Sequence, residues 1–204
     1  YKTSDKKTFS KNFNSEIKIN FNKMLTGTND DVSNFAMIAS INKGSYDKLS
    51  LKGNFSKNEI IEMSIYQVDK DKKTLQVISD RARPFIKGFD FIEGFEGGKL
   101  EYESIISNKV TNSNLTITDF KVSKVPALAQ VLTLASLQGI ADTLSGEGIR
   151  FESFEMKSKS EGNVMEIEDV LAIGPAVSIL LDGYVDKGKI VSLRGTLIPA
   201  TKLN

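Results

Sequence analysis

The sequence predicts a mainly β, α+β fold: a curved antiparallel sheet that forms a β-groove, with two helices packed on one face. Apolar residues alternate with polar ones over most of the chain, as they do in half-buried strands. Short polar turns separate the alternating runs, which is typical of neighbouring antiparallel strands. Only two segments show helical spacing instead, and lone helices among runs of strands argue against βαβ units.

The first part of the chain is predicted to be a meander of strands. Ile17, Ile19 and Phe21 alternate with polar residues, and Leu49 and Leu51 repeat the spacing. Two further runs with the same alternation are Ile61, Met63 and Ile65, then Leu75 and Val77 after the polar turn 69–73. One region, 1–204, is therefore expected, with a strand meander over 1–79.

A first helix is predicted over 80–95. Its apolar residues Phe85, Phe89 and Ile92 are spaced by four and then three residues, so they share one helical face. A proline near its start and two glycines at 97–98, just past its end, are typical of helix boundaries.

A second helix is predicted over 126–144. It begins at Pro126, has a broad apolar face, and ends at the glycine-containing turn 145–148. Asp142 and several uncharged polar residues make it a poor membrane span, because a carboxylate in a bilayer is costly. We interpret it as a buried helix or one that lies along a groove.

The remaining strands lie between and after these helices. The last two face each other across a hairpin turn at 186–188, and Val177, Ile179 and Leu181 share one face of the first of them. The expected strands are 99–106 and 114–122 between the helices, then 149–157, 163–173, 176–186 and 189–198.

Composition excludes several classes of function. The chain has 27 Lys and Arg residues against 26 Asp and Glu, and their signs alternate, so it lacks the concentrated positive charge of nucleic-acid binders. It contains no Cys, and its lack of His removes the usual base of a catalytic triad and the commonest zinc ligand. A Ser-Lys dyad remains formally possible, but no spacing singles out a pair.

The acidic and glycine motifs are also weak. The pairs Glu101/Glu103 and Glu166/Glu168 are two residues apart on strands, so each pair points to one face that we expect to be solvated. Glycines at 94–98 and 146–148 match neither a dinucleotide fingerprint nor a P-loop. The predictions are therefore no enzyme, no catalytic residue, no cofactor and no metal site.

What remains is apolar surface, for which two interpretations stay open. The helices cover it as an ordinary core, or an open sheet leaves part of it free as a lipid groove. The candidate groove residues are Leu115, Ile117, Val177, Ile179, Leu181, Val191, Leu193 and Leu197.

Several segments together resemble the C-terminal regions of the AsmA-like family, whose relatives include YhdP and TamB. The longest is KVPALAQVLTLASLQGI at 124–140, and the resemblance covers about 80–204, while 1–79 agrees only as amphipathic strands. The other segments, in order, are GGKL within 94–100, LSGEGIRF at 144–151, IGPA at 173–176, LDGYVD at 181–186 and LRGTLIPA at 193–200.

The resemblance implies a piece of a longer, non-enzymatic envelope protein of Gram-negative bacteria. Such proteins are periplasmic, anchored to the inner membrane by a segment absent from this chain, and associated with phospholipid transport and outer-membrane biogenesis. The implied partner is a phospholipid or another acyl-chain lipid, with envelope proteins as further partners and no nucleic acid. The alternative is a structural or protein-interaction module with a closed core and no lipid ligand.

Overall fold

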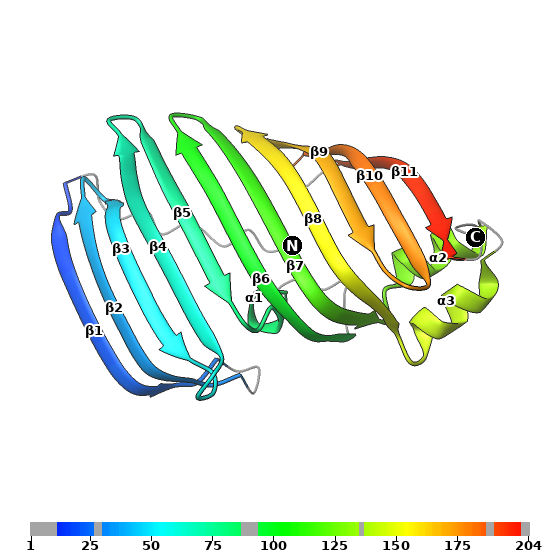
Figure 1. Ribbon diagram of the computed structural model, residues 1–204. Helices are drawn as coiled ribbons and strands as arrows, with labels where there is room; N and C mark the ends of the chain where they lie inside the picture. Colours follow the sequence, from blue (N-terminus) through cyan, green and yellow to red (C-terminus); the bar gives the residue numbers. More distant parts are fainter. Residues whose placement is uncertain (1–11, 27–29, 87–93, 135–136, 187–189, 201–204) are drawn as a thin grey trace.

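The computed structural model describes residues 12–26, 30–86, 94–134, 137–186 and 190–200. Within them the fold is mainly β, and the strands form one open antiparallel sheet of eleven strands, each paired with its neighbours in sequence (Figure 1). The strands are β1 (Ser15–Met24), β2 (Val32–Asn42), β3 (Ser45–Asn54), β4 (Ile60–Asp69), β5 (Lys72–Ser79), β6 (Gly94–Ser107), β7 (Val110–Ser123), β8 (Ile149–Glu161), β9 (Val164–Ile173), β10 (Val177–Asp186) and β11 (Ile190–Pro199). The helices are α1 (Arg83–Ile86), α2 (Pro126–Leu134) and α3 (Gln138–Ser145).

The two ends of the strands differ. At one end, here called the turn end, two-residue turns at 43–44, 70–71, 108–109 and 162–163 join successive strands. At the other, the helix end, α1 follows β5, and α2 and α3 connect β7 to β8 (Figure 1). The meander and the strand order were predicted from the alternation, except for one strand.

β2 is the strand that the alternation did not reveal. Asn34 has a positive φ of 52°, and the register with β3 shifts between Ser33 and Ala36. This bulge changes which residues face inward, so the buried Val32 and Phe35 are three residues apart. Ile38, in the middle of the strand, is 61% exposed on the opposite face. Period two is therefore broken in the sequence although the segment is a strand.

The first predicted helix was too long. Only Arg83–Ile86 is helical, 87–93 lies outside the described residues, and Gly94 and Phe95 already belong to β6. The two glycines that were expected to end a helix lie inside β6 instead. Both have positive φ, 72° at Gly97 and 85° at Gly98.

The second predicted helix divides into α2 and α3. The Leu137 amide donates to the Leu132 carbonyl at 2.8 Å, closing the connection between them. α2 begins at Pro126 as predicted, because a proline at the first helical position needs no amide partner. The Lys124 amide donates to the Leu144 carbonyl, so the two ends of this insertion lie together.

A kink crosses β6, β7 and β8 at the same level. Gly97 and Gly98 in β6 are paired with β7 around Asp119, which has a φ of 55°. Beyond the kink, inward-facing positions are offset by one residue, so Ile117 and Phe120 are both buried. The Phe120 ring stacks between two others, with centroids 5.3 Å from that of Phe95 and 5.4 Å from that of Phe151.

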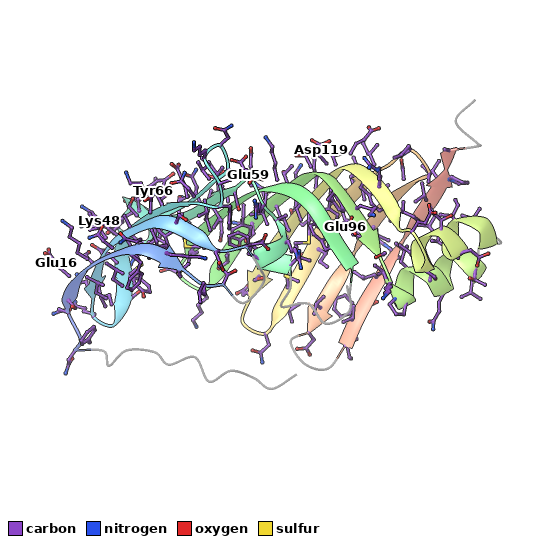
Figure 2. The ribbon with its side chains drawn as sticks, turned by 90° about the horizontal axis from the view of Figure 1, so that it is seen from below. Glu16, Lys48, Glu59, Tyr66, Glu96 and Asp119 are labelled. Atoms are coloured by element: carbon purple, nitrogen blue, oxygen red, sulfur yellow. The ribbon has the colours of Figure 1, made fainter. Side chains whose placement is uncertain are left out.

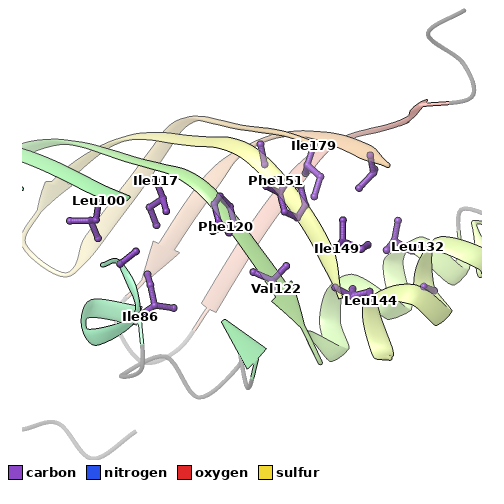
Figure 3. Packing of buried hydrophobic residues seen from close by; sticks show 14 of the residues in the cluster. Ile86, Leu100, Ile117, Phe120, Val122, Leu132, Leu144, Ile149, Phe151 and Ile179 are labelled. Carbon is purple, nitrogen blue, oxygen red and sulfur yellow. The ribbon is translucent and has the colours of Figure 1, made fainter. Parts of the chain in front are cut away.

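The hydrophobic core lies at the helix end. Leu132 of α2 and Leu144 of α3 have no exposed surface and belong to one cluster with Phe120 and Ile149 (Figure 3). Ile86 of α1 joins the same cluster. The three helices therefore pack at the ends of the central strands.

Gly98 provides a test of this packing. A Cβ at this position would lie 3.2 Å from side-chain atoms of Ala82, Ile117 and Phe120, whereas one at Gly162 (φ 58°) would meet nothing within 4 Å. We expect Gly98→Ala to lower the free energy of unfolding by about 3 kcal/mol, from backbone strain and crowding together. Gly162→Ala should cost about 1 kcal/mol, from backbone strain alone. Urea unfolding followed by circular dichroism measures both, and equal losses would contradict the close packing at Gly98.

Candidate functional site

The most extensive feature of the sheet is a row of apolar side chains that crosses every strand. Residues directly opposite one another in an antiparallel ladder point to the same face, so the register defines the row. Each of its members pairs with the next, and none is charged. This middle row consists of Ile19, Met37, Leu51, Met63, Val77, Tyr102, Leu115, Met156, Val170, Leu181 and Gly195.

Two further rows flank it on the same face, because residues two apart on a strand share a face. The helix-side row begins at β3 and contains Gly53, Ile61, Ser79, Leu100, Ile117, Phe154, Ala172, Ile179 and Leu197. The turn-side row contains Ile17, Ala39, Leu49, Ile65, Leu75, Ser104, Ser113, Ser158, Ile167, Gly183 and Leu193. We call the face with these three rows the apolar face.

The opposite face is mostly polar, although Ile78 and Leu180 are 47% and 46% exposed on it. Figure 2 shows Glu16, Lys48 and Tyr66 on one side of the sheet, which is bent rather than flat. A register row of this face, apolar only at Ile38, runs through Lys18, Ile38, Ser50, Ser64, Gln76, Glu103, Asn114, Lys157 and Asp169. The sheet thus has one apolar side and one hydrated side.

All eight residues that the sequence singled out lie on the apolar face. Leu115 and Leu181 are in the middle row, and Leu193 is in the turn-side row. The helix-side row contains Ile117, Ile179 and Leu197, the last two directly opposite each other.

The other two lie beyond the three rows. Val177 is opposite Pro199 and fully buried in the core cluster, so it serves packing. Val191 is opposite Val185 at the far end of β11 and is 66% exposed. The eight positions are therefore distributed over the length of the strands and do not form one compact site.

Sequence reasoning missed the contribution of β1 to β5 to this face. Met37, Leu51 and Met63 continue the middle row directly from Ile19 to Val77. The signal was present in the alternation of these strands other than β2, but only a complete meander in register shows that the runs join into one surface.

A second feature is an ionic cluster at the helix end. Arg81, which follows β5, donates to Asp30 Oδ1 at 3.0 Å and to Glu59 Oε2 at 2.6 and 3.2 Å. Its guanidinium also lies 5.3 Å from the Phe55 ring centroid. Asp30 is 6% exposed, and among the described groups its Oδ2 has no hydrogen-bond partner, the nearest cation being Arg83 Nε at 4.0 Å. The cluster ties the loops before β2 and β4 to the end of β5.

The contacts in this cluster shift the pKa values of Glu59 and Arg81. Hydrogen bonds from Arg81, and to a lesser extent Ser56, lower the pKa of Glu59, since they favour its carboxylate. The same hydrogen bond with Glu59 raises the pKa of Arg81. Glu59 is about one-third exposed, so solvent screens its interaction.

Replacing Arg81 with Leu should lower the free energy of unfolding by about 3 kcal/mol at neutral pH, because it leaves Asp30 buried without a partner. Glu59 has a lowered folded pKa, so its stabilisation is complete above the unfolded pKa, about 4.3, and is lost as the pH falls through the folded value. The difference from wild type should therefore shrink between about pH 5 and pH 3 as Glu59 becomes protonated. Urea unfolding at each pH measures this.

Arg83→Leu is the control for that experiment. Its side chain is 51% exposed, and the 4.0 Å separation from Asp30 is too long for a hydrogen bond. Its loss should be below about 1 kcal/mol. A deficit for Arg81→Leu that did not depend on pH would show that the contact with Glu59 does not contribute to it.

The acidic pairs singled out in the sequence lie at the surface. Glu101, Glu103, Glu166 and Glu168 are exposed on strands, as predicted. No group of three or more metal-ligating side chains converges in the described part of the chain. A shallow depression on the surface is lined by Lys121, Glu147, Gly148 and Arg150. None of the described helices is both long enough and apolar enough to cross a membrane.

Comparison of the chain with models of protein families gives no match, and neither does comparison with curated proteins or with solved structures.

Proposed function

We propose that this chain is a non-enzymatic, lipid-binding part of a bacterial envelope protein of the AsmA-like type, and that its apolar face is a hydrophobic groove for acyl chains. The observation that carries the proposal is the middle row, which crosses eleven strands without a charged residue. A row of this kind suits a long hydrocarbon chain, since each methylene removed from water contributes about 0.8 kcal/mol.

The apolar face has accessible area at both ends, although exposed apolar residues such as Ile78 and Leu180 also occur on the opposite face. Isolated exposed apolar residues are ordinary, but a continuous apolar strip on a soluble protein marks a binding surface. Phe21, Leu193 and Val191 are 51%, 47% and 66% exposed, so both ends of the face retain accessible apolar area. Between them, residues of the middle row such as Leu51, Met63 and Leu115 are only partly buried.

The cellular role follows from the resemblance in the sequence. We propose a periplasmic location, attachment to the inner membrane through a segment outside this chain, and participation in phospholipid transport or outer-membrane biogenesis. The groove needs no cofactor, because holding a chain requires only an apolar lining.

A second candidate is a protein-interaction module, and the β10–β11 end favours it. Leu180 and Ile198 are 46% and 38% exposed on the polar side, while Leu193 is exposed on the apolar side. β11 ends the described sheet, and an edge strand with apolar residues on both faces readily pairs with another strand. Glu16 and Lys18 make the β1 edge less suitable.

Native mass spectrometry of the purified protein, with organic extraction of copurifying material, separates the two functions. Phospholipid at a defined stoichiometry is expected for the groove. A protein that is empty and also rejects added fluorescent phospholipid would contradict the groove and favour the interaction module.

A matched pair of variants tests which face binds lipid. Leu193 and Leu180 are 47% and 46% exposed on adjacent strands but point to opposite faces. Leu193→Asp should weaken fluorescent-phospholipid binding at least tenfold, because a charge on the lining must be desolvated. Leu180→Asp should leave it within about twofold, and thermal unfolding checks that both variants are folded. Equal effects of the two would show that the apolar face is not the lining.

A further inference from the structure

On the central strands β6, β7 and β8, the apolar face carries a cluster of hydroxyl side chains, of which those of Ser104 and Ser158 are buried. Within the turn-side row, Ser104, Ser113 and Ser158 are directly opposite one another. In the next row toward the turn end, Thr111 lies opposite Ser160. We call Ser104, Thr111, Ser113, Ser158 and Ser160 the hydroxyl patch.

The patch interrupts a row that is otherwise apolar or glycine. On its two sides the turn-side row continues with Leu75 of β5 and Ile167 of β9. Toward the helices, the same three strands present Tyr102, Leu115 and Met156 in the middle row. The polarity therefore changes along the strands, over about 7 Å between adjacent rows of one face.

The polar gradient continues past the patch to the turn end. The four two-residue turns there contain three lysines, Lys43, Lys70 and Lys109, and one acidic residue, Asp71. Lys109 is in the turn that joins β6 to β7, the two strands that contribute Ser104, Thr111 and Ser113. On β7 the side chains of this face thus change from Leu115 to Ser113 and Thr111 before the turn with Lys109, whereas β6 presents the 37% exposed Ile106 opposite Thr111.

This order matches the chemistry of one ligand class. A hydroxyl both donates and accepts hydrogen bonds, so it can donate to an ester carbonyl, whereas a hydrocarbon chain offers no acceptor. Tyr102 Oη and Ser113 Oγ are 3.0 Å apart and hydrogen-bonded, which holds one hydroxyl at the boundary between the middle row and the patch. A lysine favours a phosphate through charge-assisted hydrogen bonds.

We propose that the partly exposed hydroxyls of the patch, Thr111, Ser113 and Ser160, receive the ester-linked glycerol of a glycerophospholipid whose chains lie on the middle row and whose phosphate points toward Lys109. The inference rests on the lipid-binding function proposed above and adds the position and orientation of the headgroup. In this proposal, side chains of the central strands distinguish a phospholipid from a plain hydrocarbon.

Three probes test it with a double variant of two partly exposed hydroxyls that lie opposite each other, Thr111→Val with Ser160→Ala. The probes are dioleoylphosphatidylglycerol, dioleoylglycerol and diphenylhexatriene, which carry ester and phosphate, ester alone, and neither. Loss of the hydroxyls should weaken binding of both ester lipids about tenfold. Binding of diphenylhexatriene should stay within twofold. Lys109→Gln should weaken only the phosphatidylglycerol, with the effect disappearing at high salt.

The matched control is Ser50→Ala with Ser64→Ala. These two serines are also directly opposite each other on adjacent strands, but on the polar face. This variant should bind all three probes as wild type does. An unchanged affinity of the patch variant for ester lipids, or an equal loss for diphenylhexatriene, would overturn the headgroup position alone. Failure of the wild type to bind any of the three would overturn the lipid-binding function as well.

Discussion

The register of the antiparallel ladder is the constraint on which this structure depends. Because each strand pairs with its sequence neighbours, the position of one turn determines which residue faces which on the next strand. A slip by one residue would move Leu51 or Met63 to the hydrated face and break the middle row. At the turn end, two-residue turns set the register between strands that are neighbours in sequence. The connections that contain helices lie at the helix end.

At the helix end, the bent central strands pack against helices. β6, β7 and β8 are the longest strands, and the kink at Gly98 and Asp119 keeps apolar side chains inward on both sides of it. α3 then packs against the ends of β7 and β8, where Phe120 and Phe151 stack, and α2 packs against α3. Outside this helical packing, the Arg81–Asp30 ion pair connects the loop before β2 to the end of β5.

Much of the sheet was readable from the sequence, because side-chain alternation has a fixed period. The eight candidate residues fell on one face for that reason, since positions such as Ile179 and Leu181 differ by two. Register was not readable, because the pairing of Ser104 with Ser113 depends on a turn and not on composition. The Arg81–Asp30 contact joins residues 51 apart in the chain, and no local pattern indicates it.

The two ends of the strands also impose opposite requirements on anything that occupies the apolar face. Toward the helices, Leu132 and Leu144 fill the space beside the central strands with apolar side chains. Toward the turns, Ser104 and Ser158 replace the large side chains found in the same row at Leu75 and Ile167. A hydrocarbon forms no hydrogen bond with these hydroxyl groups. An amphiphile that places its polar end near them binds in one preferred orientation. On the lipid-binding function proposed above, a ligand with one polar end therefore fits this face better than a purely apolar one does.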